Sequence, residues 1–212
     1  MTTLVCFALK EEAAPLRKVA AGIPGTAILI AGVGRQNAER SVRRFLDACS
    51  PKLVLTCGFA GGLDPKLKLG EVVFEMADSV PAEWEEKLLA AGAKPVKFFC
   101  ASRVATTAAE KQKLRQDTGA DAVEMESAAI HAVCRERGLP CVTVRVISDP
   151  AGEDLPLDFN VLTKPDQSLD FMKLALAIAK SPWKIGGLLA LQKHTSLAAR
   201  QLAAVLKQVI SQ

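Results

Sequence analysis

The sequence lacks several features that would place a protein in a distinctive class. No apolar run approaches the length of a membrane span, and the first residues carry no basic region of the kind that opens a signal peptide. The net charge is only +4, no dense basic block is present, and aromatic residues make up 5% of the chain. We therefore expect a cytoplasmic protein without stable membrane insertion, and nucleic acid is a poor candidate as its partner.

Metal binding and triad chemistry also have little support in the sequence. The six cysteines show no CxxC or other metal-ligand spacing, and several lie in apolar runs, where cysteine acts as a small buried hydrophobe. His131 lies within a helical pattern, His194 is the only other histidine, and no G-x-S-x-G motif occurs. The sequence predicts no metal site and no Ser/His/Asp triad, and its thiols suit a reducing compartment.

What the 212 residues do contain is an alternation of short apolar runs with helical patterns. The runs are continuously apolar, which is typical of strands covered on both faces. Strands are expected at residues 3–9, 26–31, 52–57, 70–75, 95–100 and 140–147. Helices are expected near residues 35–48, 82–91, 107–118, 126–137, 168–180 and 193–210, with room for a short one at 184–191. Thr107 and Glu110 have capping-box spacing, and Gly119 and Gly138 stand where helices would end.

This alternation predicts an α/β fold. We expect one domain over residues 1–212, with a mostly parallel central sheet in a three-layer α/β/α arrangement and with C-terminal helices packed on it. In such a sheet the carboxyl ends of parallel strands meet at one edge, where ligands bind.

Two acidic residues stand at that edge. Glu126 lies in AVEMES at a strand-to-helix junction, and Asp149 ends the apolar run VRVISD. Two carboxylates there suit a polyol such as ribose and the protonation of a departing base, although Asp149 before Pro150 also has the pattern of a helix N-cap. Glu124 alternates with Glu126 along the same run, so the two should face opposite sides, and Glu124 then needs a buried partner or a solvated edge.

Glycines follow two of the expected strands. The stretch Gly32–Ala38 superficially resembles a dinucleotide-binding fingerprint, but its third small residue comes one place late and no acidic residue follows at the expected distance. A tight turn beside a ligand is the better interpretation, with a nicotinamide site as the rival. The stretch Gly58–Leu63 allows either a close backbone approach to a ligand, with free N–H groups, or a flexible turn.

Glu11 and Glu12 follow the first strand. Both could be solvated acids in the first turn of a helix, where a carboxylate complements the macrodipole. That interpretation is the better one for Glu11. A carboxylate at Glu12 could equally act as a general base on a water molecule.

Together these segments resemble the superfamily of purine nucleoside phosphorylases and methylthioadenosine/adenosylhomocysteine nucleosidases. The resemblance covers roughly residues 1–180 and rests on three stretches: FALKEEAAPLR, TCGFAGGLDPKLKLGEVV and DAVEMESAAIHAVCRERGLPCVTVRVISD. It implies cleavage of the N-glycosidic bond of a purine nucleoside, without a metal or organic cofactor, by an enzyme that forms a homodimer.

The resemblance also implies roles for single residues. Glu12 falls where the nucleosidases hold the base that activates water, and Asp149 falls on the acid that faces purine N7. Val104 falls on the residue whose backbone addresses the purine edge. The ribose-contacting positions fall on Gly61, Met125 and Glu126, and Glu126 would bind the vicinal hydroxyls.

The nucleophile is either water or phosphate. A carboxylate at Glu12 would repel phosphate, and Lys10 and Arg35 are too few cations for a phosphate cradle. Hydrolysis is therefore favoured, while a phosphorylase that uses phosphate as co-substrate and the same Asp149 and Glu126 is the alternative.

Several departures bear on the substrate. Phe59 stands where the methylthioadenosine enzymes have a small hydroxyl residue, Arg103 stands where they have an aromatic base-stacker, and the stretch before PVKFFC is shorter. These changes also leave open a non-catalytic nucleoside-binding protein. The patterns VATTAAEKQKLRQDTGADAVEMES, ISDPAGEDLPLDF and SPWKIGGLLALQKHTSLAARQLAAVL are more similar to the hopanoid-associated branch, whose members are held to release adenine from adenosylhopane.

Overall fold

A computed structural model describes residues 2–20, 23–77, 80–162, 172–173, 176 and 182–211. Within these residues an eight-stranded sheet has the central order β2-β1-β3-β8-β4-β5, and β7 pairs with β3 and with β6. Its strands are β1 (Thr3–Phe7), β2 (Thr26–Ile30), β3 (Leu53–Gly62), β4 (Val72–Met76), β5 (Lys94–Pro95), β6 (Phe98–Cys100), β7 (Ala122–Glu124) and β8 (Cys141–Asp149). Five of the seven pairings are parallel, with β4–β8 and β3–β7 antiparallel, so the expected mostly parallel sheet is confirmed.

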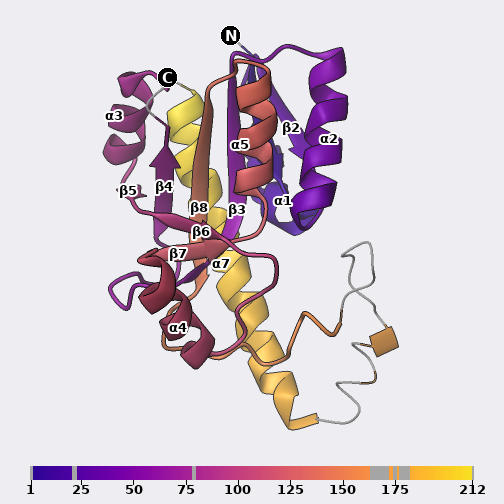
Figure 1. Ribbon diagram of the computed structural model, residues 1–212, viewed down its shortest axis with the longest axis vertical. Coiled ribbons are helices and arrows are strands. Elements are labelled where there is room, and N and C mark those ends of the chain that lie inside the picture. The colour runs from indigo at the N-terminus through magenta and orange to yellow at the C-terminus, as the bar shows by residue number, and fades with distance from the viewer. Residues whose placement is uncertain are drawn as a thin grey trace.

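Helices cover both faces of this sheet (Figure 1). The described helices are α1 (Lys10–Ala20), α2 (Arg35–Ala48), α3 (Ala82–Ala90), α4 (Ala108–Thr118), α5 (Ser127–Glu136), the 3₁₀ turn η1 (Pro182–Lys184) and α7 (Ile185–Ile210). Strand β1 shows how the layers form, because its side chains alternate between the faces. Leu4 and Cys6 pack in the cluster formed with α2 and α5, while Val5 and Phe7 pack in the cluster formed with α1, α3 and α7. The expected three-layer α/β/α fold is confirmed.

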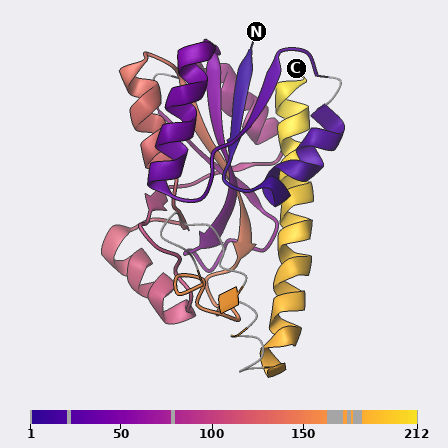
Figure 2. The same ribbon diagram turned by 90° about the vertical axis from the view of Figure 1, so that its right-hand side faces the viewer.

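The long helix α7 lies against one face of the sheet and extends beyond the ends of its strands (Figure 2). Strands β6 and β7 and helix α4 lie at the same end of the molecule (Figure 1). The helix expected at 193–210 is present, but it is not separate from the possible short helix at 184–191: one helix runs from Ile185 to Ile210 without a proline to interrupt it. The helix expected at 168–180 falls largely outside the described residues. None of the described helices is long and apolar enough to cross a membrane.

The second glycine-rich stretch is not a loop. Strand β3 continues through it to Gly62, pairing with β8 on one side and with β7 on the other. Of the two alternatives for this stretch, the flexible turn is therefore wrong, while Gly61 does bring the backbone to the wall of a cavity. Gly58 has a φ of +149° and opposes Arg145 in β8, and a Cβ at Gly58 would meet Arg145 Nη1 and Glu12 Oε1 at 2.7 Å each. This glycine lets β3 pass directly beneath two charged side chains.

Other local expectations hold or fail for identifiable reasons. The capping box of Thr107 and Glu110 opens α4, and Gly119 and Gly138 adopt left-handed conformations after α4 and α5. The single strand expected at 95–100 is two short strands, β5 and β6, which pair with different neighbours. Asp149 is the last residue of β8 and does not cap a helix.

Candidate active site

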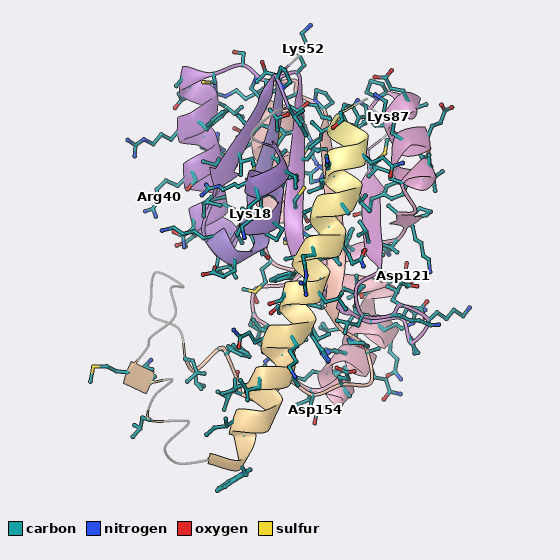
Figure 3. The ribbon with its side chains drawn as sticks, turned by 180° about the vertical axis from the view of Figure 1, so that it is seen from behind. Lys18, Arg40, Lys52, Lys87, Asp121 and Asp154 are labelled. Atoms are coloured by element: carbon teal, nitrogen blue, oxygen red, sulfur yellow. The ribbon has the colours of Figure 1, made fainter. Side chains whose placement is uncertain are left out.

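A cavity of about 200 Å³ opens where β1, β3 and β8 end and where β7 leads into α5. All the residues predicted from the sequence to act on or bind a nucleoside line it: Glu12, Phe59, Gly61, Arg103, Val104, Met125, Glu126 and Asp149. They come from five separate segments of the chain, and the fold brings them together at the predicted edge. Exposed charges such as Lys18, Arg40 and Lys52 lie instead on the outside of the molecule (Figure 3).

Arg145, in the middle of β8, is the central charge beneath this cavity. It is 1% exposed, and its Nη2 lies 2.7 Å from Glu124 Oε2 and 3.3 Å from Glu126 Oε2. Burial lowers the pKa of Arg145, but the carboxylates of Glu124, Glu126 and Glu12 outweigh burial and raise it. Arg145 is therefore a fixed cation shared by three buried acids.

Glu124 is the acid that this cation satisfies most fully. Its carboxylate accepts hydrogen bonds from the backbone N–H groups of Glu126 and Ser127 and from the Ser127 hydroxyl, besides its ion pair with Arg145. Burial raises its pKa, but Arg145 and these hydrogen bonds prevail and lower it. The expected buried partner of Glu124 is thus present. Strict alternation with Glu126 fails because β7 ends at Glu124 and Glu126 is the N-cap residue of α5.

Glu126 keeps part of its carboxylate available to a ligand. Its Oε1 accepts a hydrogen bond from Gly34 N at 2.9 Å, and its Oε2 faces Arg145. Burial is the main reason that its pKa is raised. The N–H of Gly34, at the N-terminus of α2, thus donates to Glu126. A pyrophosphate could bind at this helix end only by displacing that carboxylate. This arrangement argues against the dinucleotide interpretation.

Glu12 lies in the first turn of α1 and is 4% exposed. Its Oε2 accepts a hydrogen bond from Leu9 N at 2.8 Å, which caps the helix, and its Oε1 accepts one from Phe59 N at 2.9 Å. Burial raises the pKa of Glu12 to about 7, against the lowering influence of Arg145 and of these hydrogen bonds. Such a carboxyl group can exchange a proton near neutral pH. Glu11 is exposed, as expected of a solvated helix residue.

Asp149 has a separate electrostatic environment at the end of β8. The Ser148 hydroxyl donates to its Oδ1 at 2.7 Å, and the ammonium of Lys111 lies 2.7 Å from its Oδ2. Gly61 lies against the same carboxylate, because a Cβ there would meet Oδ2 at 3.1 Å. Burial raises the pKa of Asp149, and Lys111 opposes this rise without cancelling it.

The remaining wall contains Val104, which is expected to face the purine edge, and the two departures from the methylthioadenosine enzymes, Arg103 and Phe59. The backbone N–H of Val104 donates to Asn160 Oδ1 at 2.9 Å, and Asn160 Nδ2 donates to the Val104 carbonyl at 3.0 Å. The Arg103 side chain is 60% exposed and pairs with Glu110 at 2.6 Å. Phe59 is half-buried and packs against the main core, as well as lining the cavity.

The sequence reasoning missed three residues that organise this site: Arg145, Lys111 and Asn160. A signal existed for Arg145, because a charged residue within a continuously apolar strand needs buried partners. Lys111 carries no comparable signal among the other charged residues of α4, and neither does Asn160 in its loop. Lys10 and Arg35, the expected candidates for binding phosphate, are exposed and do not line the cavity. Among the described residues, no group of three or more His, Cys, Asp or Glu side chains could hold a metal ion.

Comparisons with known proteins give the family of this chain. The family described as the phosphorylase superfamily matches residues 94–181. A 5'-methylthioadenosine/S-adenosylhomocysteine nucleosidase from Marinomonas sp. (strain MWYL1) is 30% identical over 169 residues, which cover 65% of this chain and 73% of that protein.

Solved structures share the fold. The 5'-methylthioadenosine/S-adenosyl homocysteine nucleosidase of Campylobacter jejuni has a TM-score of 0.71 at 17% identity, covering 100% of this chain and 99% of that one. The futalosine hydrolase of Helicobacter pylori has a TM-score of 0.72 at 16% identity, covering 99% of this chain and 97% of that one. The likeness to these structures shows a common architecture, and the 30% identity to the Marinomonas protein shows common descent. The chain belongs to the phosphorylase superfamily of enzymes.

Proposed function

We propose that this protein cleaves the N-glycosidic bond of a 5'-substituted purine nucleoside with water and releases the free base. The observation that carries the proposal is the meeting of Glu12, Glu126 and Asp149 at one cavity, each with different partners. Three carboxyl groups in distinct environments can take three tasks: activating water, holding the ribose and stabilising the departing base. The relatives named as nucleosidases support the same reaction class.

In the proposed reaction, Glu126 accepts hydrogen bonds from the vicinal ribose hydroxyls. Asp149 donates a proton to purine N7, so that the base takes the electrons of the C1'–N9 bond and leaves. Glu12 accepts a proton from a water molecule as the water oxygen bonds to C1'. The sugar passes through an oxocarbenium-like state, which the carboxylates near the cavity floor stabilise electrostatically.

Water is the proposed nucleophile because the cavity floor is acidic. Glu12, Glu124 and Glu126 share the single cation Arg145, so a phosphate anion there would meet surplus negative charge. Arg145 lies behind these acids and does not line the cavity itself. Among the described residues that do line it, Arg103 is the only cation, and Glu110 pairs with it.

For the substrate we propose an adenine nucleoside with a large apolar 5' substituent, as in the hopanoid-associated branch. Leu9, Val33 and Phe59 give the cavity an apolar wall beside Glu12 and Glu126, which supports such a group. The resemblance of the C-terminal segment to that branch is the second support. We also propose that the enzyme forms a homodimer, as the same resemblance implies.

A substrate panel tests the proposal. Adenosine, methylthioadenosine, adenosylhomocysteine, a futalosine-like nucleoside and a lipid-tailed adenosine would be assayed with and without phosphate, by release of the base and of the sugar product. We expect base release in phosphate-free buffer and the highest kcat/KM for the lipid-tailed nucleoside. Release of ribose 1-phosphate that depends on phosphate would instead make the protein a phosphorylase.

Variants separate an enzyme from a nucleoside-binding protein. Removing a positioned proton donor or acceptor typically costs roughly 10²–10⁴-fold in rate, so Asp149→Asn and Glu12→Gln should lose activity to this extent. Neither substitution changes Glu126 or the backbone of Val104, so nucleoside binding, measured by calorimetry, should persist in both variants. Unchanged binding together with no turnover of any panel member by the wild type would refute the enzymatic proposal.

A further inference from the structure

We propose that Lys111 is a positioning residue for Asp149, which fixes one carboxyl oxygen in an ion pair and so determines the oxygen that carries the catalytic proton. The inference rests on the proposed role of Asp149 in releasing the base. Lys111 lies in α4, and its side chain is completely buried. A buried ammonium is rare unless it is paired, so its surroundings need an explanation.

All the donors of this ammonium are engaged within the protein. Lys111 Nζ lies 2.7 Å from Asp149 Oδ2 and donates to the carbonyl oxygens of Pro150 and Glu153 at 2.9 Å each. A lysine ammonium has three N–H groups, and these three acceptors use them. Lys111 therefore does not contact the substrate directly, and it acts through Asp149 and through the chain that follows it.

The ion pair makes the two oxygens of Asp149 unequal. Protonation of Oδ2 would place a proton against an ammonium, so Oδ2 stays unprotonated. Oδ1 faces the Ser148 hydroxyl at 2.7 Å, and a hydroxyl can donate to a carboxylate or accept from a carboxylic acid. Ser148 Oγ also lies 3.4 Å from the Ala60 carbonyl, which can take its proton when Asp149 is protonated. Oδ1 is thus the oxygen that gains and loses the proton.

Lys111 also sets how readily that proton is held. Burial favours the neutral form of Asp149, the carboxylate of Glu153 in the following loop acts in the same direction, and the Lys111 ammonium and Ser148 oppose both. An opposite charge within a few ångströms typically lowers a carboxyl pKa by roughly 1–3 units. Without Lys111, Asp149 would remain protonated to considerably higher pH.

Lys113, two residues further along α4, provides a matched control. Its side chain is 76% exposed and pairs with Asp117 on the same helix. The experiment compares Lys111→Met and Lys113→Met, which remove the same charge from the same helix. The limb of the kcat/KM profile assigned to Asp149, by its absence in Asp149→Asn, should move up by at least about one pH unit in Lys111→Met. It should stay in place in Lys113→Met and in Lys111→Arg, which keeps the positive charge.

An unchanged limb in Lys111→Met, even in a destabilised protein, would reduce Lys111 to a structural role and overturn the proposal. The titration of the Asp149 carboxyl carbon, followed by NMR in protein labelled with ¹³C aspartate, gives the same answer without turnover. The NMR result therefore decides on Lys111 even if no nucleoside is cleaved, whereas failure of the whole substrate panel would count against the proposed function alone.

If Lys111→Met does not fold, the wild-type ammonium can be observed instead. In ¹⁵N-lysine protein the Lys111 Nζ resonance should shift with the titration midpoint of Asp149, and this shift should vanish in Asp149→Asn. A Lys111 resonance that is indifferent to Asp149→Asn would overturn the proposed ion pair.

Discussion

The candidate site contains two buried charge systems with opposite designs. On the side of α1 and α5, Arg145 is shared by Glu124, Glu126 and Glu12, so full ionisation would leave surplus negative charge. At the end of β8, Lys111 serves a single carboxylate, Asp149, in a balanced pair. The first system has fewer cations than acids, whereas in the second one cation faces one acid.

This difference explains how the pKa values are distributed. Glu124 takes most of the stabilisation that Arg145 offers, and its pKa is lowered. Glu12 receives less, burial prevails, and its pKa rises to about 7. A shortage of positive charge thus leaves a buried carboxyl group that can change protonation state near neutral pH, as a general base must. In the second system Lys111 holds Asp149 in place, and burial still raises the pKa of Asp149.

Arg145→Met should have the largest effect, because it removes the shared cation. Breaking a buried ion pair by deleting one partner typically costs roughly 3–5 kcal/mol, and here three acids lose their partner. The loss in the free energy of unfolding should be greater at pH 8 than at pH 5, where protonated acids need no counter-charge. Urea unfolding at both values measures it. Arg43→Met, which breaks an exposed pair with Glu136, should stay close to the wild type at both. Equal losses at the two pH values would show that the acids do not depend on Arg145.

Glu12→Gln removes one of the acids that share Arg145, whereas Arg145→Met removes the cation. A folded-state pKa of about 7 against an ordinary 4.5 means that the folded protein binds the proton more tightly. The bound proton therefore stabilises the folded protein below about pH 4.5. This contribution to the free energy of unfolding, about 3 kcal/mol, is lost as the pH rises through 7. Glutamine does not titrate, so the variant should gain that much relative to the wild type between pH 4.5 and pH 8.

Parallel unfolding curves for wild type and Glu12→Gln across this range would contradict the raised pKa. The kinetic counterpart is an acid limb near pH 7 in the wild-type kcat/KM profile, because Glu12 must be ionised to accept a proton from water. The limb should be missing from the residual activity of Glu12→Gln.

The two systems also differ in how far the sequence predicts them. Glu12, Glu126 and Asp149 can be proposed from the sequence because acidic residues that follow strands at the carboxyl edge of a sheet suit a nucleoside, and because the motifs around them resemble a known family. Their counter-charges were not identified, since pairing across the sheet depends on register. Arg145 opposes Gly58 in the β3–β8 ladder, and Lys111 reaches Asp149 from a helix 38 residues earlier in the chain. Strand and helix positions follow from local patterns, whereas these partnerships arise only when the elements pack.

Gly58→Ala should have an intermediate effect, confined to the Arg145 system. The added Cβ would meet Arg145 Nη1 and Glu12 Oε1 at 2.7 Å each, and the backbone φ of +149° disfavours a side chain. We expect a loss of roughly 1–3 kcal/mol in unfolding free energy from overpacking and strain, together with an altered acid limb. Gly119→Ala is the control, because that glycine also has a positive φ but no atom lies within 4 Å of its added Cβ. A wild-type pH profile in Gly58→Ala would show that this glycine does not influence the protonation of Glu12 beside Arg145.

Arg103→Ala should have the smallest effect on stability, and it sharpens the contrast between buried and exposed charge. The Arg103–Glu110 pair lies at the cavity wall, but the arginine side chain is 60% exposed, so water and salt screen the interaction. Its loss should change the free energy of unfolding by less than about 1 kcal/mol, and the difference should shrink further in 1 M salt. A change in KM without a matching change in kcat would indicate that Arg103 contacts the ground-state substrate. A stability loss as large as that of Arg145→Met would mean that the loss of a charge at this site has the same effect whether the charge is buried or exposed. It would contradict the contrast between the buried Arg145 and the exposed Arg103.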